Sequence, residues 1–405
     1  MPERFTPVQK TLLDLLAASL FGAARQPAEA DPADLWREAY VQGVFLLAFR
    51  NVEPDGYPPT VRREMQTSVK RFVASNVMLS RAHSALSCLL EEAGIPHAII
   101  KGYACSVWYP EPELRQLGDV DFLVAREDIP RAGALLEANG YTSACQSHGR
   151  HDLYYKDNLR FEMHYALPGV PEGTAGDACR QALAGLIERS AVRQTPFGPM
   201  RLPSVYDHGL VVLLHLTHHL TNSGVGLRQL CDWAVFVETL REEEYRAMFG
   251  ETLRQLGLLR FADCLNDLCA RYLGCSAVPL APVDPALADA LLEDILSGGN
   301  FGQKNVDRSR QAYLITSGTG QNNRLLRMGS LLREMVFQKW PLTRRHPVLL
   351  PVGLVRFAAV YGWRAAHGKR PKLHARQAVR GAKERTDLYD RLRLFEAEKE
   401  KKDHD

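Results

Sequence analysis

Helical spacing of apolar residues dominates both ends of this chain, and a short stretch between them changes to strand spacing. Leucine, valine, phenylalanine and alanine recur every three or four positions over 8–24, 34–50 and 60–93, and the last run stops at Gly94. The same spacing returns over 205–220 and 227–240. The pattern predicts a mainly helical protein with a smaller unit of another kind inserted near residue 95.

The inserted unit, residues 95–168, alternates between short apolar runs and glycine or proline breaks. We expect strands at 95–100, 116–124, 141–146, 152–156 and 159–167, with helices at 103–109 and 128–139. Asp157-Asn158 has the composition of a two-residue hairpin turn. The predicted fold class is therefore α+β, a small mixed sheet with flanking helices between helical regions.

These changes of pattern suggest four regions along the chain. They are an N-terminal helical region over 1–94, an α/β core over 95–170, a helical domain over 171–345 that completes a cleft, and a basic helical tail over 346–405. From residue 173 to about 296 the pattern indicates helices only.

Composition and charge narrow the class of protein without naming it. The 405 residues carry 50 Lys and Arg against 47 Asp and Glu, a net charge of +3 that gives no global argument for nucleic-acid or membrane binding. The eight cysteines include no Cys-x-x-Cys pair, so we expect buried thiols in a reducing cytoplasm. We see no signal peptide, and no apolar run long enough to predict a membrane span.

The chemistry is concentrated in Asp119-x-Asp121, which follows Gly118 and leads into an apolar strand. Side chains two apart on a strand point to one face, so the two carboxylates are expected side by side. At ~4 Å two such charges repel by about 4 kcal/mol at an intermediate dielectric. A shared proton, a basic neighbour or a divalent cation must offset that cost, and magnesium bridging to phosphate is one such arrangement.

A third acid stands on the last predicted strand of the unit, where Arg160, Glu162 and His164 share one face. Two acids on one strand and a third on a neighbour are what a two-metal nucleotidyl-transfer site requires. Upstream, Lys101-Gly102 occupies a strand-to-helix turn where backbone N–H groups and the lysine could approach a phosphate. Arg115 could hold phosphate or pair with the aspartates.

These motifs together resemble the bacterial family described as uncharacterised nucleotidyltransferases, within the DNA polymerase β-like superfamily. The matching segments are Ile100-Lys-Gly-Tyr-Ala, Tyr109-Pro, Arg115-x-x-Gly-Asp-Val-Asp-Phe-Leu-Val, Gly140-Tyr and Phe161-Glu-Met-His, with further likeness at Asn76, at 215–219, at Arg228-x-x-x-Asp232 and at 345–351.

The resemblance implies a specific site. Asp119, Asp121 and Glu162 would form the metal-binding triad for two Mg2+ ions, with an NTP such as ATP as substrate. Lys101 and Gly102 would replace the Gly-Ser or Gly-Gly turn of the superfamily. The sequence departs from that pattern at Tyr103, and in the longer distance from the turn to the aspartates.

Several histidines and one arginine have both a functional and a structural interpretation. His148 and His151 are predicted in a loop, more typical of surface residues than of substrate contacts. Helical spacing puts His215, His218 and His219 on one side, and we favour a cleft position over a metal site. Arg228 and Asp232, four apart, are interpreted first as a helix-surface ion pair. For the nucleotide, the predicted contacts are Lys101, Gly102, Arg115, Gly118, His164, His219 and Arg228.

We therefore expect a cytoplasmic, Mg2+-dependent enzyme that transfers NMP from an NTP to an acceptor hydroxyl and releases pyrophosphate. The acceptor, whether small molecule, sugar, peptide or protein, is not determined, and nucleic acid is not indicated. The alternatives are a toxin-like or antibiotic-modifying nucleotidyltransferase, a metal-dependent phosphohydrolase, and an inactive nucleotide-binding scaffold of a biosynthetic or toxin–antitoxin-like system. The mildly basic end of the chain, with 13 Lys and Arg against 8 Asp and Glu in the last 45 residues, is expected to be a solvated face.

Overall fold

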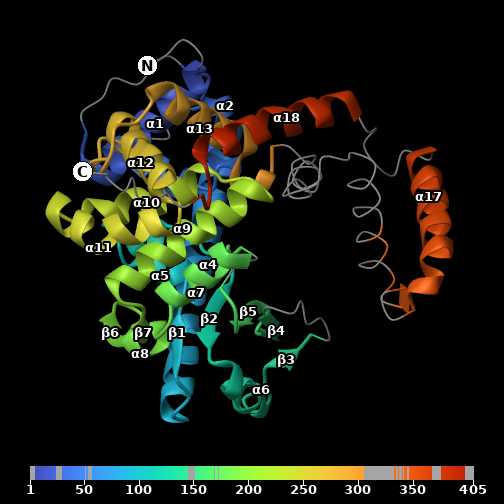
Figure 1. Ribbon diagram of the computed structural model, residues 1–405. Coiled ribbons are helices and arrows are strands. Elements are labelled where there is room, and N and C mark those ends of the chain that lie inside the picture. The colour runs from blue at the N-terminus through green and yellow to red at the C-terminus, as the bar shows by residue number, and fades with distance from the viewer. Residues whose placement is uncertain are drawn as a thin grey trace, which may run out of the picture.

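The protein is α+β, as expected, with a helical body above a small sheet in the view of Figure 1. The computed structural model describes residues 5–23, 30–50, 52, 57–144, 151–167, 169–171, 173–304, 346–366 and 375–396, with isolated positions between 333 and 343. His148 lies outside these residues, as do most of residues 305–345, the end of the helical domain predicted over 171–345.

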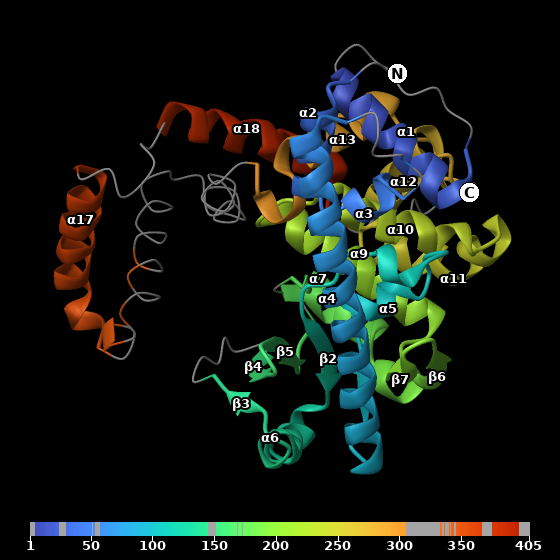
Figure 2. The ribbon, with the colours of Figure 1, turned by 180° about the vertical axis from the view of Figure 1, so that it is seen from behind.

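The N-terminal helices lead into one long helix that joins the two halves. They are α1 (Pro7–Phe21), α2 (Pro32–Val41), α3 (Phe45–Ala48) and α4 (Pro59–Glu92). In α1 the side chain of Thr6 accepts from the backbone of Gln9, whose own side chain accepts from Thr6, so both ends of a capping box are present. Figure 2 shows α4 running from the helical body down past the sheet.

The sheet matches the predicted order of elements. Its strands are β1 (His97–Ile99), β2 (Val120–Val124), β3 (Thr142–Ser143), β4 (His151–Lys156) and β5 (Leu159–His164), with α5 (Gly102–Ser106) and α6 (Ile129–Ala138) between them. The spatial order is β1-β2-β5-β4-β3, and only β2 and β5 are parallel. Asp157 and Asn158 both have positive φ, so the predicted two-residue hairpin turn is confirmed.

The chain then builds the helical half of the cleft. The elements are α7 (Gly173–Ala182), α8 (Leu186–Arg189), β6 (Ala191–Thr195), β7 (Gly198–Leu202), α9 (Val205–Thr221), α10 (Leu227–Glu238), α11 (Glu242–Gln255), α12 (Leu259–Leu268), η4 (Cys269–Leu273), α13 (Pro285–Gly298) and η5 (Asn300–Gly302). The expectation of helices only was wrong at the β6–β7 hairpin. Its strands pair with each other and β7 packs on α4 and β1, contacts that no local pattern reveals.

Two hydrophobic cores meet along α4. The larger lies among α1, α2, α9, α10, α12 and α13, around Trp36, Phe45, Trp233, Phe236 and Phe249. The smaller lies between α4 and the sheet, where Leu79, Leu86 and Leu90 pack with apolar side chains of the strands. Because α4 contributes to both, it fixes the distance between the sheet and the helical body, and with it the cleft between them.

The last described elements are η6 (Pro347–Leu349), α17 (Leu350–Ala366) and α18 (Ala375–Leu392). Helix α18 packs on the end of α9, because Arg385 Nη2 donates to the carbonyl of Leu220 at 2.7 Å, and Tyr389 donates to the same oxygen. Helix α17 stands apart from the body in both views (Figures 1 and 2). None of the helices in the described part of the chain has the length and apolarity needed to cross a bilayer.

Candidate functional site

The strand wall of the cleft begins with β2. Val120 and Phe122 point into the smaller core and are fully buried, so the alternation of the strand turns Asp121 to the opposite face. Asp119 lies two residues earlier, at the entry to the strand. A fully buried amide from α4 fixes that entry: Asn76 donates to the carbonyls of Glu113 and Arg115 and accepts from Leu117 N–H.

Glu162 lies beside Asp121 on the same face of the sheet. The parallel register pairs Asp121 with Glu162, and the Nε2 atom of His164 is 2.8 Å from Asp121 Oδ1 and 3.3 Å from Glu162 Oε2. Arg160 forms an ion pair with Glu162, and its Nη2 lies 3.7 Å from Asp119 Oδ2. His164 therefore contacts Asp121 and Glu162, and Arg160 contacts Glu162 and Asp119. These shared partners show that the three acids surround one small volume.

Lys101 reaches the same place from the turn after β1. Its Nζ lies 2.6 Å from Asp121 Oδ1 and 3.2 Å from His164 Nε2. Its φ of 53° is unusual for a residue with a Cβ, so the surrounding structure holds this backbone in a costly conformation. At Gly102 a Cβ would approach His83 Nε2 to 3.1 Å, so the turn and the close packing both favour glycine. Helix α5 is only five residues long, so the partial positive charge at its N-terminus is smaller than that of the longer helix predicted over 103–109.

The charges on this wall perturb one another. Burial and the charge of Asp121 raise the pKa of Asp119 to about 6. Burial alone would raise the pKa of Asp121, but Lys101 and His164 favour its charged form and hold that pKa well below the usual value. Burial and the charge of Lys101 lower the pKa of His164, although Asp121 opposes the shift.

Helix α9 supplies histidines to the opposite wall. His215, His218 and His219 all line the cleft, and the Nε2 atoms of His215 and His219 lie 3.1 Å apart. His219 Nδ1 is 2.8 Å from Ser223 Oγ, which holds the ring in place. Burial and neighbouring positive groups lower the pKa of both His215 and His219 well below the usual value. Both rings are therefore neutral near pH 7 and offer hydrogen bonds rather than charge.

The predicted surface ion pair between Arg228 and Asp232 was wrong, because both residues are buried and Asp232 pairs with Arg115 instead. Arg115 Nε and Nη2 donate to the two Asp232 oxygens at 2.6 and 2.7 Å, and Tyr109 adds a third hydrogen bond at 2.7 Å. Arg115 therefore joins the α/β core to α10, and its ion pair is with Asp232 rather than with Asp119 or Asp121, as the sequence had suggested. Burial alone would lower the pKa of Arg115, but the charge of Asp232 outweighs burial and raises that pKa.

Arg228 keeps its charge without a carboxylate partner among the described residues. Its Nη1 donates to the carbonyl of Gln116 at 2.9 Å, its guanidinium lies 5.0 Å from the ring centre of Phe301, and its Nε has no hydrogen-bond partner in the described chain. Burial and the charge of Arg115 lower its pKa. A buried cation of this kind, lining a cavity, is suited to an anionic ligand.

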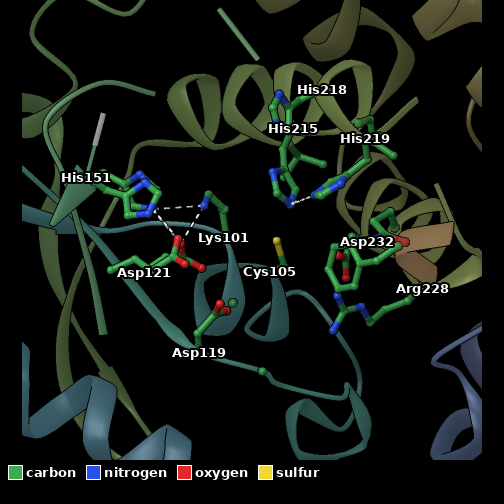
Figure 3. Close-up of a pocket in the computed structure, with 18 of the residues that line it drawn as sticks. Lys101, Cys105, Asp119, Asp121, His151, His215, His218, His219, Arg228 and Asp232 are labelled. Atoms are coloured by element: carbon green, nitrogen blue, oxygen red, sulfur yellow. Dashed lines mark hydrogen bonds and ion pairs between the residues drawn. The ribbon is translucent and has the colours of Figure 1, made fainter. Parts of the chain in front are cut away.

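The two walls enclose a cavity of about 450 Å3. Figure 3 shows Asp119, Asp121 and Lys101 on one side, the α9 histidines and Arg228 on the other, and Cys105 between them. All predicted site residues line it: Lys101, Gly102, Arg115, Gly118, Asp119, Asp121, Glu162, His164, His219 and Arg228. The volume falls in the range of small-molecule pockets.

The sequence did not place His151, Arg160, Cys105 or Phe301 in the cleft, yet all four line it. His151 was expected in a surface loop, but it begins β4 and pairs with His164. The signal was present, since counting outward from the Asp157-Asn158 turn sets His151 opposite His164. With Glu162 these two histidines offer ligand atoms within 4.8 Å of one another. For Phe301, far along the chain, no local signal exists.

Comparison with known proteins identifies the family. Residues 28–274 match the model of a family described as uncharacterised nucleotidyltransferases. The chain belongs to this family. The match covers more than half of this chain and includes the strands and helices that form both walls of the cleft. It confirms the resemblance seen in the sequence. No curated protein matches the chain at a significant level.

The chain is also similar to solved structures, but more weakly. ANT(2'')-Ia in complex with adenylyl-2''-tobramycin is 12% identical, with a TM-score of 0.31 over 44% of this chain and 97% of that one. An antigenic nucleotidyltransferase-like protein from Paracoccidioides brasiliensis is 13% identical, with a TM-score of 0.30 over 45% of this chain and 91% of that one.

Proposed function

We propose that this chain is a Mg2+-dependent nucleotidyltransferase that moves NMP from an NTP to an acceptor hydroxyl and releases pyrophosphate. The observation that carries the proposal is the convergence of Asp121 and Glu162 on His164, from adjacent positions of two parallel strands. Asp119 joins them through Arg160, and the cavity that they line also holds Arg228, whose charge meets no carboxylate in the part of the chain that the structure describes.

The donor set fits a divalent cation. Carboxylate oxygens are the ligands that Mg2+ prefers, and Lys101 and Arg160 already bring positive charge to the same acids. The imidazoles of His151 and His164 beside Glu162 add nitrogen donors, which suit Mn2+ better than Mg2+. When bound, such ions would polarise the α-phosphate and lower the pKa of the acceptor hydroxyl. In this proposal Asp119, Asp121 and Glu162 are the ligands.

The remaining roles, phosphate binding, proton acceptance and hydrogen bonding, fall to residues on both walls. Arg228 binds phosphate oxygens, and Lys101, which contacts Asp121 in this structure, would be free to do the same if Asp121 held a metal ion. Glu162 accepts the proton of the acceptor hydroxyl. The hydroxyl oxygen then bonds to the α-phosphorus, the bond from that phosphorus to the bridging oxygen of the β-phosphate breaks, and pyrophosphate leaves. The neutral rings of His215 and His219 hydrogen-bond the base or the acceptor.

An inactive scaffold is the second candidate, and one contact favours it. The ammonium of Lys101 lies 2.6 Å from Asp121 Oδ1, where a metal ligand would otherwise be open, so the acids are already neutralised without an ion. A scaffold of this kind would bind nucleotide and turn over none.

The discriminating experiment incubates the protein with each α-labelled NTP, Mg2+ or Mn2+, and a panel of hydroxyl acceptors. We expect metal-dependent pyrophosphate release and transfer of label, both lost in Asp119→Asn. The control Asp157→Asn changes an acid of the same sheet, in a turn whose positive φ suits asparagine. Nucleotide binding without release would support the scaffold, and release of inorganic phosphate would point to a phosphohydrolase.

A further inference from the structure

Helix α17, together with η6 just before it, carries an apolar stripe that the rest of the described chain leaves exposed. Val348, Val352, Val355 and Trp363 are 88, 66, 71 and 52% exposed. With the exposed Ala359 they follow one another at spacings of three or four residues, which keeps them within an arc of about 80° on a helix. Large apolar side chains gathered in this way mark an interaction surface.

The other side of α17 is already used. A Cβ at Gly353 would lie 2.6 Å from Val336 Cγ1 and 3.2 Å from Thr343 Cγ2, so the helix packs closely on these residues. Arg356 stacks on Trp340, with the guanidinium 4.2 Å from the ring centre, and flanks the stripe. The stripe therefore faces outward because its opposite face has a partner.

The charge around α17 indicates what covers the stripe. The 49 residues from 335 to 383 contain no Asp or Glu. Their basic residues are Lys339, Arg344, Arg345, Arg356, Arg364, Lys369, Arg370, Lys372, Arg376, Arg380 and Lys383. In a chain whose net charge is +3, this segment alone carries +11, so the rest of the molecule is acidic. An apolar stripe with a tryptophan, set among basic residues, fits an anionic surface that has an apolar interior.

We propose that α17 docks the protein on the surface of a membrane that contains anionic lipids. The stripe enters the boundary between headgroups and acyl chains, and the lysines and arginines of this stretch of the sequence contact the lipid phosphates. The helix has 17 residues, about 26 Å, which is shorter than the ~30 Å needed to span a bilayer. A nucleic acid offers negative charge but no apolar layer, so it leaves the stripe unexplained.

Co-sedimentation with lipid vesicles tests this directly and needs no enzymatic turnover. Full-length protein is mixed with vesicles of phosphatidylcholine alone, or of phosphatidylcholine with phosphatidylglycerol. We expect at least about tenfold more binding to the anionic vesicles, falling as salt is raised. Trp363 should give a blue shift in fluorescence on these vesicles that Trp363→Phe lacks. Equal binding to both lipids, or binding to neither, overturns the proposal.

A pair of charge variants tests the stripe itself. Val352→Asp with Val355→Asp should reduce vesicle binding at least about tenfold, because it buries two charges in the lipid boundary. The matched control, Met78→Asp with Val192→Asp, adds the same charge at two other exposed apolar residues and should bind like the parent. Thermal unfolding checks that both variants fold.

Two other results would assign the stripe to a different occupant. If the stripe variant alone loses a dimer seen by sedimentation velocity while vesicle binding is absent, a second copy covers α17. If the chain binds single-stranded RNA but no vesicle, and the stripe variant binds RNA equally well, the basic residues serve nucleic acid. Either result contradicts membrane docking. All of these experiments measure binding, so their results do not depend on whether the protein transfers nucleotides.

Discussion

The two walls of the cleft hold charge in different ways. On the strand wall, Asp121 and Glu162 meet Lys101, Arg160 and His164 within the same few ångströms, so every acid has a positively charged or hydrogen-bonding neighbour. On the helix wall, both oxygens of Asp232 accept from Arg115 and Tyr109, and Arg228 has no carboxylate partner within the described residues.

This difference explains why one wall suits cations and the other suits anions. In the proposed function, metal ions would take the place of Lys101 and Arg160 beside the acids of the strand wall. The helix wall offers Arg228 no such internal partner, because Asp232, one turn along α10, already pairs with Arg115 and Tyr109. An NTP with its metal ions would match both requirements at once, with metals on the strands and phosphate charge toward Arg228.

The largest expected effect comes from removing acids of the strand wall. Asp119→Asn and Asp121→Asn should each lower turnover at least about a thousandfold, because each removes a proposed metal ligand. Their stabilities should differ: without metal, Asp119→Asn should unfold at the same temperature or higher, since it removes repulsion with Asp121. Asp121→Asn should unfold at a lower temperature, because Lys101, only 11% exposed, loses its carboxylate partner. Pyrophosphate release and thermal unfolding measure both properties, and a loss of folding in Asp119→Asn would mark that residue as structural.

The helix wall should lose stability when its buried ion pair between Arg115 and Asp232 is broken. Asp232→Ala leaves the buried Arg115 guanidinium without a carboxylate, so the free energy of unfolding should fall by about 3–5 kcal/mol. The exposed pair Arg180–Asp177 provides the control, and Asp177→Ala should change stability by less than about 1 kcal/mol. Denaturant unfolding compares them. Similar small losses in both would mean that Arg115 does not depend on Asp232.

Arg228 should affect nucleotide binding with little effect on folding. Arg228→Gln should raise the KM for NTP about tenfold to a hundredfold, because a charge-assisted contact to phosphate is lost. Stability should hold or rise, since a buried unpaired cation is removed. Arg246→Gln, on the exposed side of α11, serves as the control. An unchanged KM in Arg228→Gln would remove this residue from the nucleotide site.

The smallest expected effect is a pH dependence of stability caused by His208, which lies behind the helix wall. His208 is buried between the rings of Trp108 and Phe236, and burial lowers its pKa to about 3. The folded state resists its protonation, so its contribution is complete above the unfolded pKa of about 6.5 and declines as pH falls toward 3. Stability should fall by up to about 1.4 kcal/mol per pH unit from this group. His208→Phe should flatten that slope between pH 6.5 and 5, whereas the exposed His346→Gln should leave it unchanged.

Local pattern was sufficient for the sheet and for the three acids. Alternation along β2 and β5 determined which face of each strand carries Asp121 and Glu162, and the parallel register of the two strands sets these residues side by side. The Asp157-Asn158 turn fixed the pairing of β4 with β5. The same turn also determined that His151 faces His164, although the loop-like composition before it suggested a surface position. Strand period and turn chemistry act between near neighbours, so they can be read from the chain.

The sequence by itself determined the main helices, the strands of the five-stranded sheet, the α+β class and the acidic strand face, because these depend on spacing within a few residues. Only the tertiary structure decided which charges pair. Arg228 and Asp232 are suitably spaced for an ion pair on one helix, yet Arg115, 117 residues away along the chain from Asp232, takes both carboxylate oxygens. A buried charge selects the partner that best replaces its lost water, and burial is a property of the whole fold.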